Sequence, residues 1–244
     1  MAIKTFPLTL KWAEMLTPNV RHLALETADG QPLEFIPGQF ISIHFDWEGK
    51  PLRRSYSIAS IPGQSTLVEF AVSYVENGAA SQYLFALEPG DMIQASGPFG
   101  RLVLKEEQPE RYILVATGTG VTPYRAMLPE IAKRSQENPQ QTYTVLLGVQ
   151  KRQDALYIED FIKFAEQHPQ FQFYVHYSRE PASTNLQPYE KTGYVQTAFK
   201  ELNINPEADL IYLCGNPNMI DDAVLLTKEA GFPIQKVRRE KYVS

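Results

Sequence analysis

The chain has 244 residues, 43% hydrophobic and 21% charged, the composition of an ordinary globular protein with room for two domains. Its formal net charge of -5 argues against nucleic acid as a general partner. A single cysteine, Cys214, excludes a disulfide framework and any zinc or iron–sulfur site built from several cysteines of this chain. Residues 1–16 lack an apolar leader segment, and no stretch approaches the roughly 18 apolar residues of a membrane span. We therefore expect a cytoplasmic protein that binds neither membrane nor nucleic acid.

Residues 1–106 have the pattern of an antiparallel β domain. Turn signals such as Pro37-Gly38, Pro62-Gly63 and Pro89-Gly90 separate short apolar stretches, as in a barrel or a sandwich. The expected strands are residues 3–12, 20–26, 39–45, 53–60, 66–75 and 91–96, with one helix at 80–87.

The expected strand at 53–60, RRSYSIAS, has no clean apolar face. Alternation places Arg54 and Tyr56 on one side and Ser55 and Ser57 on the other. Because each side mixes polar groups with larger ones, this strand is expected to face a ligand as well as a core.

The pattern changes after Lys105, where the charged, proline-containing run KEEQPE (105–110) is typical of a linker. Beyond it apolar strands alternate with helical segments, which predicts a parallel sheet with helices on both faces. The expected strands are 111–116, 143–148, 171–177, 209–215 and 235–242, and the expected helices are 122–134, 155–167, 195–200 and 217–230. We therefore predict two domains, residues 1–106 and residues 107–244.

The run VATGTGVTPYRAM (115–127) lies where an expected strand leads into a helix. Gly118 and Gly120 allow a ligand close to the backbone, and a helix N-terminus favours a pyrophosphate. Pro123 stands where the third glycine of GxGxxG would be, so an ordinary tight turn with proline near the helix start is the alternative.

Two further strand ends carry polar groups. Ser178 and Arg179 follow the strand at 171–177 and are suited to a phosphate, although a surface arginine is the simpler alternative. Cys214 and Asn216 flank a glycine after the strand at 209–215, although a lone cysteine is usually a small core residue. The sequence contains no HExxH, GxSxG or P-loop motif, so a hydrolase or P-loop enzyme is not supported.

Taken in order, these runs resemble the ferredoxin–NADP+ reductase family over essentially the whole chain. Arg54-Ser55-Tyr56-Ser57 is similar to the family's flavin motif, R-x-Y-[ST], and Gly78-Ala79-Ala80-Ser81 to the segment that meets the FAD pyrophosphate. Further matches are Gly97-Pro98-Phe99-Gly100 at the end of the barrel, Gly118-Thr119-Gly120-Val121-Thr122-Pro123 at the nucleotide loop, Cys214-Gly215-Asn216-Pro217 near the nicotinamide, and Glu240-Lys241-Tyr242 at the carboxyl end.

The resemblance implies a fold and cofactors. It implies an N-terminal antiparallel β-barrel that holds FAD, followed by an α/β parallel-sheet domain that binds NADPH (NADP+), with no metal. Ser178 and Arg179 favour NADPH over NADH, and Tyr194 belongs to the nucleotide site. The family's basic residue before this tyrosine is replaced by Thr192-Gly193, and Lys191 is the nearest substitute.

The resemblance also implies residue roles. Arg54 would neutralise the FAD pyrophosphate, Tyr56 would pack its ring against the isoalloxazine, and Ser57 would hydrogen-bond near flavin N5. Since alternation separates Ser57 from the other two, we expect a bend or bulge after Tyr56. Cys214 and Glu240 would position the nicotinamide and relay protons.

Two of the carboxyl-terminal assignments leave alternatives. Glu240 lies beside Arg238, Arg239 and Lys241 and is alternatively only an ion-pair partner. Tyr242 would cover the flavin, yet Val243 and Ser244 follow it, so the tail is alternatively placed elsewhere.

The resemblance predicts a monomeric reductase whose partner is ferredoxin or flavodoxin. Both partners are acidic, and Arg21, Lys50, Arg53 and Arg101 are candidates for a basic docking surface. The alternatives are a reductase of free flavin or a small acceptor, the reductase component of a multi-protein oxygenase, and a flavin-binding module without turnover.

Overall fold

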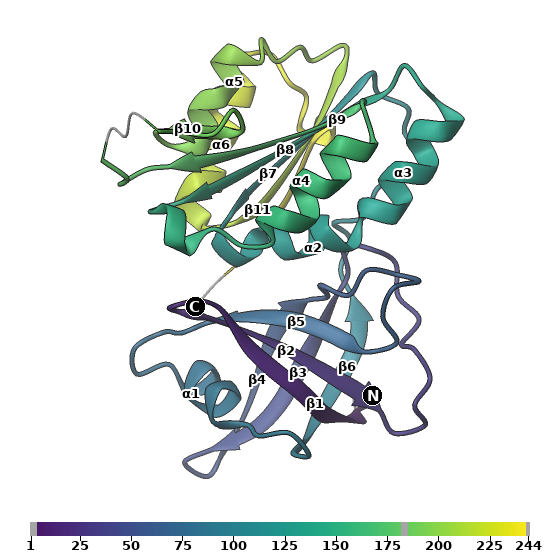
Figure 1. Ribbon diagram of the computed structural model, residues 1–244, viewed down its shortest axis with the longest axis vertical. Helices are drawn as coiled ribbons and strands as arrows, with labels where there is room; N and C mark the ends of the chain where they lie inside the picture. The colour runs from purple at the N-terminus through teal and green to yellow at the C-terminus, as the bar shows by residue number, and fades with distance from the viewer. Residues whose placement is uncertain (1–3, 182–184, 243–244) are drawn as a thin grey trace. The chain divides into compact units, whose positions relative to one another are not determined.

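The computed structural model describes residues 4–181 and 185–242 (Figure 1). They divide into two compact units. The first contains the described residues up to Leu104 together with Thr122–Met127. The second contains Lys105–Val121 and the described residues from Leu128 onward. The expected succession of an antiparallel unit and a parallel α/β unit is confirmed.

The first unit is built on a six-stranded antiparallel sheet in the order β4-β3-β6-β1-β2-β5. Its edge strands, β4 and β5, approach each other. Just past the end of β4, the Ala59 amide donates a hydrogen bond to the carbonyl of Glu69 on β5 at 2.7 Å. The sheet therefore curls into a barrel. Its elements are β1 (Phe6–Thr17), β2 (Val20–Thr27), β3 (Phe40–Trp47), β4 (Lys50–Ser57), β5 (Val68–Ser73), α1 (Ala79–Ala86), β6 (Met92–Phe99) and α2 (Thr122–Ala126).

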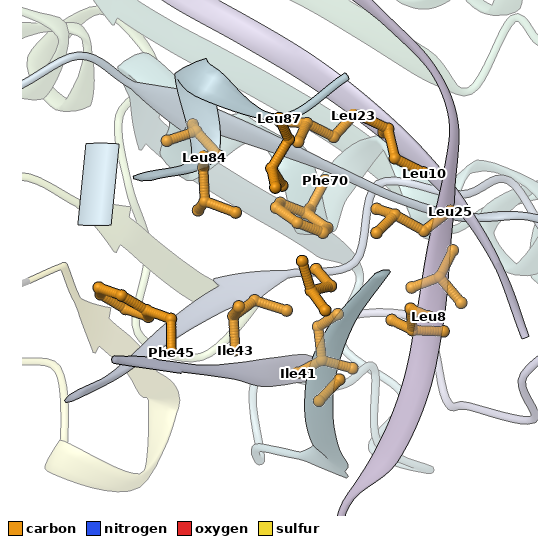
Figure 2. Packing of buried hydrophobic residues seen from close by; sticks show 14 of the residues in the cluster. Leu8, Leu10, Leu23, Leu25, Ile41, Ile43, Phe45, Phe70, Leu84 and Leu87 are labelled. Atoms are coloured by element: carbon orange, nitrogen blue, oxygen red, sulfur yellow. The ribbon is translucent and has the colours of Figure 1, made fainter. Parts of the chain in front are cut away.

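Alternate residues of these strands fill the interior of the barrel (Figure 2). Leu8 and Leu10 of β1 point inward with Ile41 and Ile43 of β3, as the two-residue period of a strand requires. Phe70 of β5 lies among them and is fully buried. Leu84 and Leu87, from α1 and the residue that follows it, belong to the same cluster.

The second unit is built on a parallel six-stranded sheet in the order β10-β9-β8-β7-β11-β12. Its central strand β7 holds Tyr112–Ala116, all fully buried, as the continuous apolar run predicted. Its elements are β7 (Arg111–Thr117), η1 (Gly118–Val121), α3 (Leu128–Glu137), β8 (Thr142–Val149), η2 (Arg152–Asp154), α4 (Ile158–Gln167), β9 (Phe171–Tyr177), β10 (Glu190–Thr192), η3 (Val195–Thr197), α5 (Ala198–Glu201), β11 (Asp209–Gly215), α6 (Pro217–Glu229), η4 (Ile234–Lys236) and β12 (Val237–Lys241).

Two details differ from the sequence-based expectation. The single helix predicted at 122–134 is wrong, because α2 ends at Ala126 and α3 begins at Leu128. Pro129 explains the break, since it has no N–H and its ring would clash with the Arg125 carbonyl of a continuous helix. The short strand β10 was not anticipated.

Among the described residues no helix is both long and apolar enough to span a bilayer.

Candidate functional site

Strand β4 carries the predicted flavin motif. It pairs with β3 in unbroken register from Lys50 to Ser57, so the bulge expected after Tyr56 is wrong. Arg54 and Tyr56 therefore remain on one side of the strand and Ser57 on the other, where it is buried. The strand ends at Ser57, and the Ile58 amide already bonds the Gln39 carbonyl, outside the ladder.

Arg54 has the environment of an anion-binding residue. Its side chain is exposed, and its Nη1 donates to the Arg53 carbonyl at 2.9 Å. No acidic side chain in the described part of the chain forms an ion pair with it. The guanidinium charge is therefore available to a phosphate, as the FAD assignment requires.

Tyr56 offers a neutral ring beside this charge. It is half-buried and stacks on Phe70 with ring centroids 5.1 Å apart. Burial raises the pKa of the phenol to about 12, with Arg54 opposing the shift, so the hydroxyl stays protonated at physiological pH. A flat ligand could pack beside this ring, although the ring's inner contacts belong to the barrel core.

The turn before α1 is built around the Ser81 hydroxyl. Ser81 is buried, and its hydroxyl accepts from the Val75 amide at 3.1 Å and donates to the Val75 and Gly78 carbonyls at 3.0 Å. A Cβ at Gly78 would lie 2.9 Å from this hydroxyl oxygen, so the turn requires glycine. Ala79, Ala80 and Ser81 begin the helix, where N–H groups lack acceptors within the helix and favour an anion.

Arg21 supports the other end of α1. Its guanidinium donates to the carbonyls of Leu84, Phe85 and Leu87 at 2.9, 2.6 and 2.8 Å. A cation at a helix C-terminus satisfies carbonyls that the helix leaves unbonded and complements its dipole. The interpretation of Arg21 as a docking residue is therefore replaced by a structural role in fixing α1.

In the second unit, the loop after β7 lies against the end of β11. A Cβ on Gly120 would be 2.9 Å from Gly215 Cα and would overlap the Cys214 carbonyl. A Cβ on Gly215 would lie 2.6 Å from the Thr117 carbonyl oxygen. The Asn216 amide donates to Thr117 Oγ1 at 2.9 Å. The absence of side chains at Gly120 and Gly215 therefore lets the backbone at the ends of β7 and β11 pack in direct contact.

The remaining groups of the nucleotide loop have distinct settings. Gly118 has a φ of 52° with open space where a Cβ would be, and Thr119 follows it in η1. Thr122 begins α2, and its buried hydroxyl has no hydrogen-bond partner among the described residues. The Asn216 side-chain oxygen accepts a hydrogen bond from the Asn218 backbone amide at 2.8 Å and caps α6.

The carboxyl end of β9 brings three predicted residues to one edge of the sheet. Ser178 and Arg179 follow β9 and donate their backbone amides to the carbonyls of Val149, the last residue of β8, and Gln150. Tyr194 follows the neighbouring β10 and is 63% exposed. Lys191 lies over the ring of Tyr174 at 5.8 Å. Arg179 is exposed, whereas the Lys191 ammonium contacts the ring of Tyr174. Arg179 is therefore the better candidate of the two for binding a phosphate.

Cys214 and Glu240 are Cα partners on β11 and β12. The thiol is fully buried, and this burial, with the Glu240 carboxylate, raises its pKa well above the ordinary value against a hydrogen bond with Tyr242. The thiol is therefore protonated at neutral pH. The Tyr242 amide donates to the Gly215 carbonyl at 2.8 Å, while Val243 and Ser244 lie outside the described residues.

Two of the three cations near Glu240 pair with other carboxylates. Lys241 Nζ pairs with the Asp221 carboxylate at 2.6 and 2.8 Å, and Arg238 pairs with Glu107. Arg239 is the third cation of this stretch, so an ion pair of Glu240 stays an alternative to a catalytic role.

Sequence reasoning missed two charge clusters, each built around a buried glutamate. In the first unit Arg125, Glu69 and His22 meet below the end of β4. In the second, the Glu190 carboxylate accepts two hydrogen bonds from Arg152, at 2.8 and 2.6 Å. No sequence pattern links partners so far apart. No group of His, Cys, Asp and Glu among residues 4–181 and 185–242 is arranged to hold a metal ion.

Family models match both units. The model described as "Oxidoreductase FAD-binding domain" matches residues 7–104, and the one described as "Oxidoreductase NAD-binding domain" matches residues 114–224. The first match covers β4 and α1, and the second covers the nucleotide loop and the ends of β9 and β11.

Named relatives agree with these matches. The chain is 32% identical over 234 residues to "Ferredoxin--NADP reductase B" of Sorangium cellulosum, covering 93% of both chains. It is 29% identical to the "Toluate 1,2-dioxygenase electron transfer component" of Pseudomonas putida, covering 94% of this chain and 65% of that protein. A crystal structure of a ferredoxin NADP+ reductase from Neisseria gonorrhoeae with bound FAD and NADP has the same fold, with a TM-score of 0.83, 20% identity, and coverage of 99% of this chain and 100% of that one.

Proposed function

Because the chain belongs to the ferredoxin–NADP+ reductase family of FAD- and nicotinamide-nucleotide-binding oxidoreductases, we propose that it exchanges hydride with NADPH and single electrons with ferredoxin or flavodoxin. The observation that carries this proposal is the exposed Arg54, which has no ion-pair partner among the described residues, beside the neutral ring of Tyr56 on a barrel edge strand. We assign FAD binding to residues 1–106 and nucleotide binding to residues 107–244.

For FAD, we assign the pyrophosphate to Arg54 and to the backbone of Gly78-Ala79-Ala80-Ser81. The Ser81 hydroxyl already bonds within the turn, so Ser81 contributes its amide and shapes the cradle. Tyr56 and Ser57 would hold the isoalloxazine, and Ser55 bonds the Ser42 hydroxyl at 3.1 Å and stiffens the strand. When bound, the flavin accepts an electron pair as hydride and releases electrons singly.

For the nucleotide, we assign the pyrophosphate to the loop Gly118-Thr119-Gly120 and to Thr122, with Gly215 and Asn216 lining the neighbouring strand end. Ser178 and Arg179 would bind the 2′-phosphate, and Tyr194 would cover the adenosine. The tight packing of Gly120 on Gly215 supports this assignment, because any side chain there would fill the space beside the loop backbone.

For catalysis, we assign Ser57, Cys214, Glu240 and Tyr242. Cys214 is held as a neutral thiol by burial, so it can orient the nicotinamide without adding charge. Glu240 is half-buried beside it and would hold or pass a proton. Tyr242, anchored through its amide to Gly215, would shield the reacting groups from water.

The change Arg179→Ala is expected to weaken binding of NADPH far more than binding of NADH. Loss of a hydrogen bond to a charged group costs roughly 1.5–3 kcal/mol, which is about a 10- to 150-fold rise in Kd. The two KM values, or the Kd values of NADP+ and NAD+, measure the difference. Lys228→Ala, which removes an exposed cation from α6, is the matched control and should change neither value. Equal weakening of both nucleotides by Arg179→Ala would contradict the 2′-phosphate assignment.

The electron partner is proposed from chemistry and from relatives. One cysteine cannot supply the ligands of an iron–sulfur cluster, so we place the cluster or flavin that accepts the electrons on another molecule. Lys50, Arg53 and Arg101 are exposed and could contact an acidic partner. The similarity to a dioxygenase electron transfer component favours a second candidate, an oxygenase reductase component. Reduction of ferredoxin or flavodoxin by NADPH tests the first candidate, and the comparison of low with high salt tests whether docking is electrostatic, since electrostatic docking weakens with salt.

A further inference from the structure

Three ionisable side chains are buried together in the first unit, just beyond the end of β4. Glu69 Oε2 on β5 lies 3.0 Å from Arg125 Nη1 and 3.4 Å from His22 Nε2. Their side chains are only 9%, 15% and 3% exposed. Trp12 stacks on His22 with ring centroids 5.2 Å apart and rings 8° from parallel. We call His22, Glu69 and Arg125 the Arg125 cluster.

The cluster also bonds the backbone that leaves the flavin strand. Arg125 Nη1 donates to the Ala59 carbonyl at 2.7 Å, while the Ala59 amide donates to the Glu69 carbonyl at 2.7 Å. Both polar backbone groups of Ala59 are therefore fixed. Ser60 adds two bonds, because its hydroxyl donates to the Leu67 carbonyl at 2.7 Å and accepts from the Glu69 amide at 2.8 Å.

This arrangement indicates that the buried charges fix the position of the backbone at Ala59. A buried ion pair adds little net stability, because desolvation offsets its attraction, but its fixed geometry can specify position. The carboxylate of Glu69 is the acidic partner that holds Arg125 Nη1, and the Ala59 carbonyl is the second acceptor of the same atom. Burial would raise the pKa of Glu69, yet its hydrogen-bond partners, His22 first, lower it to about 2, so the carboxylate keeps its charge.

We propose that Arg125 is a positioning residue for the flavin strand, and that Glu69 and His22 hold Arg125 for this purpose. Ser57, which we assign to flavin N5, precedes the fixed Ala59 by two residues. Arg125 lies on α2, which belongs with the barrel strands to the first unit. The inference rests on the proposed function, since it concerns how the assigned FAD strand is held.

The test uses the full-length chain loaded with FAD. Arg125→Ala, Arg125→Lys and Glu69→Gln are compared with the wild type by the visible absorbance of the bound flavin and by anaerobic reduction at increasing NADPH. We expect Arg125→Ala to shift the flavin absorbance and to slow the limiting reduction rate roughly 10- to 100-fold, since small misplacements of reacting groups cost that much. The NADPH concentration for half-saturation should change by less than about threefold, because a misplaced reacting group alters the rate and not the binding. Glu69→Gln should slow reduction in the same direction.

Arg125→Lys provides the rescue, since lysine keeps the charge and can donate to the same acceptors without the planar guanidinium. We expect it to restore part of the rate. Arg111→Ala, which breaks a paired arginine with a 2.7 Å contact to Asp209 in the second unit, is the matched control and should leave flavin spectrum and rate unchanged.

The outcomes separate the inference from the proposed function. A folded Arg125→Ala protein with wild-type flavin absorbance and reduction rate would overturn the inference and leave the proposed function intact. If Arg125→Ala does not fold, wild-type spectrum and rate in both Arg125→Lys and Glu69→Gln would overturn it equally. A wild-type chain that takes up no FAD would overturn both.

Discussion

Phe70→Ala is expected to destabilise the first unit by about 3–5 kcal/mol, as removal of a fully buried phenylalanine does. Phe70 is 0% exposed and lies in the barrel interior (Figure 2). It also supports the ring of Tyr56 from behind, with centroids 5.1 Å apart. Loss of a stacked aromatic pair is worth about 0.5–1.5 kcal/mol, so the FAD Kd should rise roughly two- to tenfold.

Tryptophan fluorescence during denaturant unfolding measures the stability loss, because both tryptophans, Trp12 and Trp47, belong to the first unit. Phe161→Ala in the second unit is the matched control, since Phe161 is also 0% exposed and stacks on Phe173 at 4.9 Å. It should lower stability by a similar amount, seen by circular dichroism, without weakening FAD binding. FAD affinity that falls equally in both variants would contradict the role of Phe70 behind Tyr56.

Gly120→Ala is expected to damage nucleotide binding and the second unit together. The added Cβ would lie 2.7 Å from the Cys214 carbonyl carbon and 2.9 Å from Gly215 Cα, and backbone atoms cannot move aside cheaply. Overpacking of this kind costs about 1–3 kcal/mol of stability. Displacement of the loop should also remove at least one bond to a charged phosphate, raising the Kd of NADP+ roughly 10- to 150-fold.

Gly231→Ala is the control for this change. Unlike Gly120, Gly231 has a positive φ, 83°, but a Cβ there would meet only Pro206 Cγ, at 4.0 Å. It should cost about 1–2 kcal/mol for the left-handed backbone and leave NADP+ binding unchanged. Isothermal titration with NADP+ and thermal unfolding measure both effects. Wild-type NADP+ affinity in Gly120→Ala would contradict the assignment of this loop.

The architecture was predictable because patterning dominates it. The continuous apolar run at Tyr112–Ala116 can be satisfied only by burial on both faces, and it became the central strand β7. The two-residue period of a strand likewise explains why Leu8, Leu10, Ile41 and Ile43 share the barrel interior. The helix break at Met127 was visible in principle, since Pro129 prohibits a continuous helix.

The details of the site were less predictable because they depend on contacts distant in sequence. Arg21 was interpreted as a surface cation, whereas it caps α1 about 60 residues away. Glu69 and Arg125 are separated by 56 residues, and no local pattern pairs them. The bulge expected after Tyr56 came from requiring three side chains to reach one ligand, but a regular ladder continues to Ser57.

The proposed function requires this chain to bind FAD and to reduce it with NADPH. The most direct measurement is an anaerobic titration of the purified, FAD-loaded protein with NADPH and, separately, NADH, followed by addition of oxidised ferredoxin or flavodoxin. We expect NADPH to bleach the visible flavin absorbance stoichiometrically and faster than NADH, and either protein acceptor to restore it. A protein that takes up no FAD, or a bound FAD that neither nucleotide bleaches, would contradict the proposed function.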